Sequence, residues 1–237
     1  MLLLFDIDGT LLAGATEAHR DALDAALREV HGVEAPGALR QSVQPAGRTD
    51  GEIARMLLLL AGVSAKRIDE GADAVREICC REYALRCPAD LTRTVIPGVP
   101  GLLAWLLPRA DVRLALLTGN YEPIARLKLA RAGIGDQFGP GQGAFGSDAE
   151  ARAALPLIAR RRAGDGGMPF PRDRTIVIGD TPLDIACARA DGVRAVAVAS
   201  GRFGVEALGG ADAVAADAYE LMDVLSGELS RGRASCR

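Results

Sequence analysis

Two aspartates, Asp6 and Asp8, follow an apolar run at residues 2–5. The run is typical of a buried strand, and buried strands rarely end in two carboxylates. Two like charges this close raise the free energy of the fold unless a cation or a reacting group compensates them. Taken alone, the pair also fits a polar turn after a strand, with Gly9 allowing the backbone to turn sharply. The other strand ends decide between the two interpretations.

Two further apolar runs also end in polar residues. One run leads into Thr118-Gly119-Asn120, and the other leads into Gly179-Asp180-Thr181-Pro182-Leu183-Asp184. In an open sheet of parallel strands, ligands bind outside the carboxyl ends of the strands. The three polar ends are therefore expected to meet at one edge of the sheet and to form a site there.

These side chains suit phosphoryl transfer. The oxygen ligands Asp6, Asp8 and Asp180 favour a hard cation such as Mg²⁺, which lets a carboxylate approach an anionic phosphate. One carboxylate can act as the nucleophile and form an aspartyl-phosphate. A second carboxyl group can protonate the leaving group and then activate water. A hydroxyl group and a lysine would hold the oxygens of the transferring phosphoryl group.

The elements that position these residues alternate between strands and helices. Apolar runs predict strands at residues 2–5, 112–117, 175–178 and 193–198, and a weak strand near 213–214. Helical spacing of apolar residues predicts helices at residues 16–31, 50–61, 65–86, 99–107, 122–132, 148–162, 182–191 and 218–226. The alternation indicates an α/β fold whose core is a Rossmann-like parallel sheet.

The same pattern predicts the domain organisation. No strand pattern occurs between residue 14 and about residue 90, so we expect an all-helical domain, residues 14–90, inserted after the first strand. The sheet core then comprises residues 1–13 and 91–226. Residues 227–237 are small and polar, and we expect them to form a flexible tail.

Composition excludes several classes of function. The 237-residue chain has a net charge of -3, and nothing in it resembles a basic footprint with interleaved aromatic residues, which argues against nucleic-acid binding. The apolar run 56–61 is too short to span a bilayer, which needs about 20 residues. Its five cysteines include no Cys-x-x-Cys, so we expect reduced thiols in a cytoplasmic protein. We expect a monomer or a homodimer.

The motifs, taken in order, resemble those of the haloacid dehalogenase superfamily. The resemblance rests on Asp6-x-Asp8-Gly9-Thr10-Leu11, on Leu117-Thr118-Gly119-Asn120, and on the segment from Gly179 to Asp184. The helical insertion is similar to that family's first-position cap. The chain looks most like the branch of phosphoglycolate phosphatases and β-phosphoglucomutases. Nearly the whole chain apart from the tail is covered.

The resemblance implies roles for the first pair of aspartates. Asp6 would be the nucleophile and would also bind Mg²⁺ through its other oxygen. Asp8 would be the general acid and base, with its main-chain carbonyl on the metal. The true dehalogenases of this superfamily lack an acid at the position of Asp8, so its presence favours phosphate esters as substrates.

The resemblance also implies roles for the other two strand ends. Thr118 would donate a hydrogen bond to the phosphoryl group, assisted by the backbone at Gly119 and Asn120. Asp180 would bind Mg²⁺ directly or through water. Asp184, one helical turn further on, would support the metal.

The phosphate-clamping lysine is less clearly marked. Many relatives carry a Lys-Pro pair shortly before the last aspartates, and this chain has none there. Of the two lysines, Lys66 lies in the insertion, so we assign the clamp to Lys128 on the helix after Asn120. A solvated surface lysine is the other interpretation of Lys128. Arg152 is the alternative clamp, because a guanidinium can serve the same purpose.

Within the insertion, the segment Gly47-Arg48-Thr49-Asp50 precedes a predicted helix. Thr49 or Asp50 fits an N-cap, while Arg48 fits a residue that binds a distal anionic group of the substrate, as relatives place specificity residues in a similar loop. We therefore take Arg48 and Thr49 as candidate substrate-binding residues. For His19 we expect an exposed helix histidine rather than a substrate contact.

These observations predict a Mg²⁺-dependent phosphatase that hydrolyses a small phosphorylated metabolite, such as phosphoglycolate or a sugar phosphate, through an aspartyl-phosphate. A phosphomutase of the β-phosphoglucomutase type shares the first half-reaction and is the nearest alternative. A phospho-accepting signalling module is the alternative from another class, because such modules also place acidic pairs, a Thr and a Lys on a parallel sheet.

Overall fold

The computed structural model describes residues 1–34 and 36–234. A parallel sheet with the strand order β3-β2-β1-β4-β5-β6 forms its centre. The strands are β1 (Leu2–Phe5), β2 (Arg113–Thr118), β3 (Ala144–Phe145), β4 (Thr175–Gly179), β5 (Arg194–Val198) and β6 (Ala213–Ala215). The α/β fold class predicted from the sequence is therefore confirmed.

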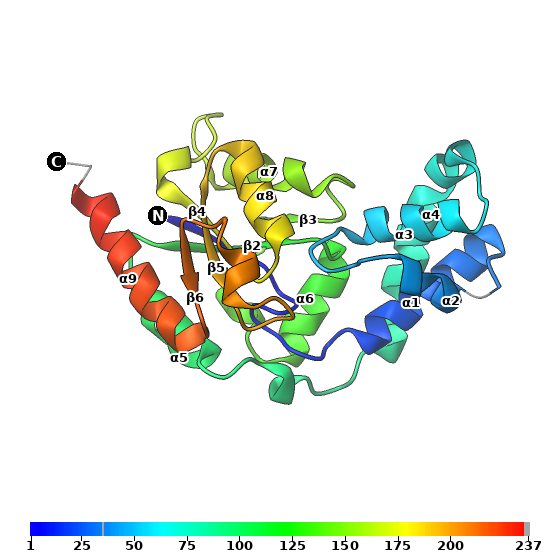
Figure 1. The fold of residues 1–237 in the computed structure, drawn as a ribbon, viewed down its shortest axis with the longest axis horizontal. Helices are drawn as coiled ribbons and strands as arrows, with labels where there is room; N and C mark the ends of the chain where they lie inside the picture. Colours follow the sequence, from blue (N-terminus) through cyan, green and yellow to red (C-terminus); the bar gives the residue numbers. More distant parts are fainter. Residues whose placement is uncertain (35, 235–237) are drawn as a thin grey trace.

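Helices cover both faces of the sheet (Figure 1). On one face, the side chains of Leu3 and Phe5 in β1 join a core with α5 (Val99–Leu106), α6 (Glu122–Arg131) and α9 (Ala218–Ala234). On the other face, Leu2 and Leu4 join a core with α7 (Leu155–Ala163) and α8 (Pro182–Asp191). Since β1 is central and covered on both sides, its run of apolar residues is continuous rather than alternating.

Four helices between β1 and β2 stand apart from the sheet and its covering helices, and we call them the helical insertion (Figure 1). They are α1 (Glu17–His31), α2 (Pro36–Leu39), α3 (Asp50–Leu60) and α4 (Ala65–Arg86). Their apolar side chains form a separate hydrophobic core, with fully buried Leu27 and Leu57 at its centre. The predicted helices at 16–31, 50–61 and 65–86 are confirmed within a residue at each end.

The strand register brings the polar strand ends together. Phe5 in β1 is level with Leu116 in β2 and with Ile178 in β4. Asp6 continues the ladder, since its main-chain N–H donates to the carbonyl of Ile178 at 2.9 Å. The residues that follow on each strand therefore leave the sheet at the same edge, as the sequence predicts.

The segment around residues 144–163 differs from the prediction. A helix over 148–162 is wrong at its start, because residues 152–154 form a short 3₁₀ turn and α7 begins only at Leu155. Pro156 explains the boundary, since proline is tolerated in the first turn of a helix but not further inside it. The short edge strand β3 lies before this turn and was not predicted.

The prediction of a flexible tail from residue 227 is also wrong as far as the structure extends. Helix α9 continues to Ala234, past the expected end at residue 226. Leu229 is buried one turn after Leu225 in the same hydrophobic core, and Glu228 pairs with Arg194 at 2.8 Å. These contacts hold the helix against the sheet. Residues 235–237, with Cys236, lie outside the described part of the chain.

Two further features concern the described residues only. None of their helices is long and apolar enough to cross a membrane. Their four cysteines, Cys79, Cys80, Cys87 and Cys187, are free.

Candidate active site

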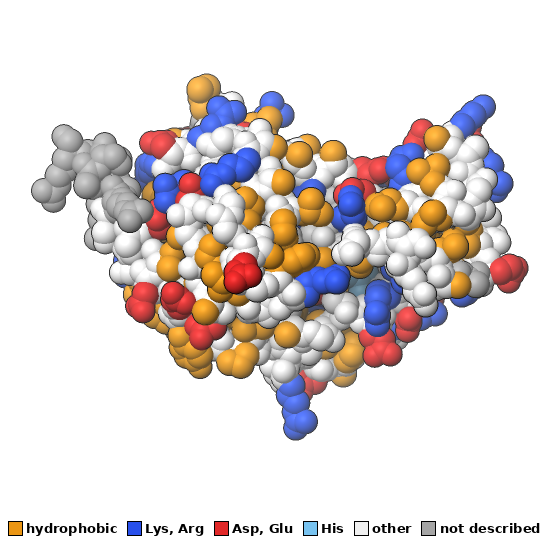
Figure 2. Space-filling model, viewed as in Figure 1, with side chains coloured by type: hydrophobic (Ala, Val, Ile, Leu, Met, Phe, Trp, Pro, Cys, Tyr) orange, Lys and Arg blue, Asp and Glu red, His pale blue; other side chains and the backbone are white. Residues whose placement is uncertain are grey.

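A cavity of about 550 Å³ lies between the helical insertion and the carboxyl edge of the sheet. Figure 2 shows Lys and Arg side chains on both sides of a hollow between these two parts of the molecule. The site residues predicted from the sequence that line the cavity are Asp6, Asp8, Arg48, Thr118, Gly119, Asn120 and Asp180. The lining described here does not include Thr49, Lys128 or Asp184.

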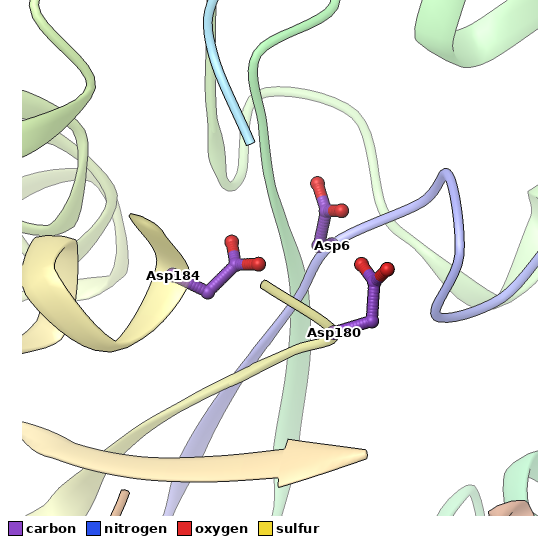
Figure 3. A group of neighbouring side chains, drawn as sticks. All are labelled: Asp6, Asp180 and Asp184. Atoms are coloured by element: carbon purple, nitrogen blue, oxygen red, sulfur yellow. The ribbon is translucent and has the colours of Figure 1, made fainter. Parts of the chain in front are cut away.

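Three buried carboxylates gather at the end of β1 and β4. One oxygen from each of Asp6, Asp180 and Asp184 lies within 4.8 Å of the other two. Figure 3 shows Asp6 and Asp180 on the loops that leave β1 and β4, and Asp184 on the first turn of α8. The sequence prediction places these three residues, together with Asp8, around a metal ion.

Glycines make room for this cluster. A Cβ atom on Gly9, whose φ is +95°, or on Gly201 would overlap the carboxylate of Asp180. Gly9 therefore serves both the turn after β1 and the close approach of Asp180. The Gly9 carbonyl is fixed in turn by the hydroxyl of Ser200, which donates to it at 2.7 Å.

Two carboxylates of the cluster, Asp6 and Asp180, resist ionisation. Burial, with smaller contributions from Asp184 and Asp8, raises the pKa of Asp6 to about 7 despite the opposing charge of Arg152. Burial and then the charges of Asp6 and Asp184 raise the pKa of Asp180 to about 8. A cation between them would relieve this repulsion. Because all the atoms that could bind a metal here are carboxylate oxygens, the cluster fits a hard divalent cation such as Mg²⁺.

Arg152, the alternative clamp, lies beside this cluster. Its Nη2 is 3.2 Å from Asp6 Oδ1 and also donates to Asp184 Oδ1. Its side chain is only 7% exposed, and the residue lines the cavity. The second oxygen of Asp184 accepts from the main-chain N–H and the hydroxyl of Thr181, at 3.0 and 2.7 Å. Asp184 thus caps α8 and orients Arg152 at the same time.

Asp8 has a different environment from Asp6. Its oxygens accept from Lys128 Nζ at 2.9 and 2.7 Å, and Oδ2 also accepts from Asn120 Nδ2 at 3.0 Å. Burial acts to raise the pKa of Asp8, but the charge and hydrogen bonds of Lys128 outweigh burial and leave that pKa below its ordinary value. The pKa values of the two neighbouring carboxyl groups are therefore shifted in opposite directions, because burial dominates at Asp6 and the neighbours of Asp8, Lys128 foremost, dominate there.

The interpretation of Lys128 as a solvated surface lysine is wrong. Its side chain is 0% exposed, although it lies on a surface helix of the core. Its ammonium group contacts Asp8 and His19, not Asp6. Of the two candidate clamps, Arg152 is the one that contacts Asp6.

The expectation of an exposed His19 is also wrong, because the residue is 8% exposed. Its Nδ1 lies 3.3 Å from Lys128 Nζ, and its Nε2 lies 3.0 Å from Asp50 Oδ2. The reason is tertiary: α1 packs its His19 face toward the sheet core, over the site, rather than toward solvent.

The loop before α3 docks directly on the core. Thr49 is the N-cap of α3, as predicted, and its hydroxyl also donates to the carbonyl of Glu150 at 2.6 Å. The Asp50 main-chain N–H donates to the Gly119 carbonyl at 2.8 Å. A Cβ atom on Gly119 would overlap the Arg48 carbonyl. The approach is therefore possible because residue 119 is glycine.

Arg48 lines the cavity, but its guanidinium has partners within the insertion. It pairs with Glu52 one turn along α3, and its Nε donates to the Gln44 carbonyl at 2.9 Å. Arg20 and Arg202 also line the cavity, and no ion pair holds either of them in the described structure. Sequence reasoning missed Arg202 and the neighbouring Ser200, although they follow β5 at the same edge of the sheet.

The comparisons with known proteins agree with this fold and site. Residues 3–189 match the family of haloacid dehalogenase-like hydrolases. That match covers more than half of the chain, so the chain belongs to this family and is an enzyme of the hydrolase type. The resemblance drawn from the strand-end motifs is thereby confirmed.

Individual relatives support the same placement. The chain is 33% identical over 205 residues to a phosphoglycolate phosphatase of Rhodospirillum rubrum, covering 84% of this chain and 79% of the relative. A hydrolase of Pseudomonas syringae superposes with a TM-score of 0.64 at 22% identity, covering 96% of this chain and 99% of the other. A β-phosphoglucomutase of Clostridium difficile superposes with a TM-score of 0.68 at 16% identity, covering 98% of each chain. These structures share the fold.

Proposed function

We propose that the protein is a Mg²⁺-dependent phosphatase that hydrolyses a small phosphorylated metabolite through an aspartyl-phosphate. The observation that carries the proposal is the position of Asp6. It faces the cavity with Arg152 on one side, two further buried carboxylates beside it, and Asp8 two residues away. The similarity to a phosphoglycolate phosphatase supports a phosphate ester as the substrate.

In the first step, a carboxylate oxygen of Asp6 attacks the phosphorus atom of the substrate. The bond between phosphorus and the ester oxygen breaks, and Asp8 gives its proton to that oxygen, so that an alcohol leaves. Asp6 then carries the phosphoryl group.

In the second step, water attacks the phosphorus atom of the aspartyl-phosphate. Asp8, now ionised, takes a proton from that water, and the bond between phosphorus and Asp6 breaks. Inorganic phosphate leaves and the Asp6 carboxylate is restored. Asn120 and Lys128 hold Asp8 between the two steps.

Positive charge and hydrogen-bond donors stabilise the transferring group. Asp6, Asp180 and the main-chain carbonyl of Asp8 would hold Mg²⁺, with Asp184 in support, and the ion would neutralise charge on the phosphoryl oxygens. Arg152 is placed to serve as the clamp on those oxygens, in preference to Lys128, because it contacts Asp6 and lines the cavity. The Thr118 hydroxyl and the backbone at Gly119 and Asn120 complete the donor set.

The helical insertion acts in this proposal as a cap over the substrate. With residues 14–90 as the cap, and residues 1–13 and 91–226 as the core, the reacting groups lie between the two. Closure of the cap excludes bulk water while the aspartyl-phosphate forms. The cavity of about 550 Å³ fits a small metabolite rather than a polymer. We also propose that the protein acts in the cytoplasm.

A panel of phosphorylated metabolites, including phosphoglycolate and sugar monophosphates, tests the proposal by release of inorganic phosphate. We expect release from at least one compound in the presence of Mg²⁺, and loss of that release with EDTA or in Asp6→Asn. Turnover that persists in EDTA or in Asp6→Asn would contradict it. Isomerisation of a sugar phosphate without free phosphate would instead identify a phosphomutase, and a stable phosphoprotein without turnover would identify a signalling module.

A further inference from the structure

Lys128 has an unusually complete set of partners. An ammonium group has three N–H donors and no acceptor. The two oxygens of Asp8 and Nδ1 of His19 provide three acceptors, at 2.9, 2.7 and 3.3 Å from Nζ. A fully buried lysine is costly unless it is paired in this way. No donor of Lys128 is left for a substrate.

The contacts of His19 fix its tautomer. Since Lys128 can only donate, Nδ1 of His19 must accept and carries no proton. The proton on Nε2 then points at Asp50 Oδ2, 3.0 Å away. The same Asp50 oxygen accepts the main-chain N–H of Tyr121 at 2.7 Å. Asp8, Lys128, His19 and Asp50 therefore form one continuous chain of hydrogen bonds, which we call the buried polar chain.

The buried polar chain crosses between the helical insertion and the core. Asp8 follows β1 and Lys128 lies on α6, both in the core, while His19 lies on α1 and Asp50 on α3 of the insertion. The ring of Tyr83 on α4 packs edge-on against His19, with ring centroids 5.6 Å apart. If the insertion moves away from the core, Lys128 loses its third acceptor while its contacts to Asp8 are free to change.

From this geometry we propose that Lys128 and His19 are positioning residues for Asp8, and that His19 completes the arrangement only when the insertion is closed over the substrate. This inference rests on the proposed function, in which Asp8 is the acid–base group. In the closed form Lys128 fixes both Asp8 oxygens, and His19, held by Asp50, fixes Lys128. Proton transfer by Asp8 is thereby tied to enclosure of the substrate.

The test compares two leaving groups. An alkyl phosphate releases an alkoxide oxygen that needs a proton, whereas p-nitrophenyl phosphate releases a phenolate that leaves without one. The quantity to measure is kcat/KM, because it covers the steps up to departure of the leaving group. Wild type, His19→Ala and His31→Ala are compared with both substrates. His31 lies at the end of the same helix and is not part of the buried polar chain, so it is the matched control.

We expect His19→Ala to lower kcat/KM for the alkyl phosphate at least about tenfold more than for p-nitrophenyl phosphate. His31→Ala should lower neither. Lys128→Met should show the same difference between substrates. His19→Asn, whose amide oxygen can replace Nδ1 as an acceptor for Lys128, should recover part of the loss and serves if His19→Ala folds poorly.

Equal losses with the two substrates in His19→Ala and His19→Asn would overturn the inference, because they indicate a purely structural role. Wild-type activity of both variants with the alkyl phosphate would overturn it as well. Failure of the proposed function is a separate result: it appears as undiminished phosphate release by Asp6→Asn, whatever the His19 variants do.

Discussion

Arg152 Nη2 lies 3.2 Å from Asp6 Oδ1 and also donates to Asp184, so one guanidinium joins the proposed nucleophile to the first turn of α8. Arg152→Ala removes the positive charge next to Asp6 and is expected to lower kcat/KM by about 10²–10³-fold. Arg152→Lys keeps the charge but loses the fork geometry, so it should recover only part of the activity.

The matched control for Arg152 is Arg161→Ala, since Arg161 is exposed on α7, which follows the Arg152 turn. Its steady-state kinetics should equal those of wild type. Wild-type kcat/KM in Arg152→Ala would show that Arg152 is not the clamp.

We expect Asp180 to make the stability of the protein depend on pH and on Mg²⁺. Its pKa is about 8 in the fold against an ordinary value of 3.8, because burial and the charges of Asp6 and Asp184 disfavour its ionised form. Between these values the folded state binds more protons than the unfolded state, so this group makes the free energy of unfolding fall as pH rises. We expect metal-free protein to lose stability from about pH 4 to pH 8 on this account.

Asp180→Asn removes this titrating group, so the metal-free variant should unfold at a higher temperature than metal-free wild type at pH 8, with a smaller difference at pH 5. Thermal unfolding at the two pH values, with and without Mg²⁺, measures the effect. Mg²⁺ should stabilise wild type at pH 8 and the variant far less. Equal stabilisation of both proteins by Mg²⁺ would place the metal elsewhere.

Gly119 controls how the helical insertion docks. A Cβ atom there would overlap the Arg48 carbonyl. Next to it, the main-chain N–H of Asp50 donates to the Gly119 carbonyl at 2.8 Å. Gly119→Ala should therefore push the insertion away and lower kcat/KM at least about tenfold, while circular dichroism still reports a folded protein.

Gly101→Ala is the control for that substitution, because a Cβ atom on Gly101 in α5 meets nothing within 4 Å. It should leave kinetics unchanged and raise stability by about 0.5–1 kcal/mol, as alanine replaces glycine in a helix. If Gly119→Ala and Gly101→Ala had the same kinetics, docking of the Arg48 loop would not matter for activity.

The sequence allowed every strand except β3, the helical insertion and the polar strand ends to be predicted. These follow from local apolar patterns and from the rule that parallel strands end at one edge. The partners of Lys128 and His19 were not predictable in this way. The two residues are 109 positions apart and meet only because the helical insertion packs on α6 of the core. No local pattern distinguishes them from exposed helix residues.

The two errors at helix boundaries have different causes, one local and one tertiary. Pro156 is visible in the sequence, and it marks the late start of α7 because proline is favoured in the first turn of a helix. The extension of α9 depends on Leu229 and on the pairing of Glu228 with Arg194, which is a tertiary contact. The preference for Arg152 over Lys128 as the clamp could not be predicted either, because it depends on the turn before α7, which places Arg152 beside Asp6.

The proposed mechanism requires Asp6 to carry the phosphoryl group between its two steps. Acid quenching during turnover of a substrate, followed by peptide mapping with mass spectrometry, tests it directly. We expect one phosphoryl group on the peptide that contains Asp6, lost on treatment with hydroxylamine and absent from Asp6→Asn. A phosphoryl group on another residue, or none at any time during rapid phosphate release by wild type, would contradict it.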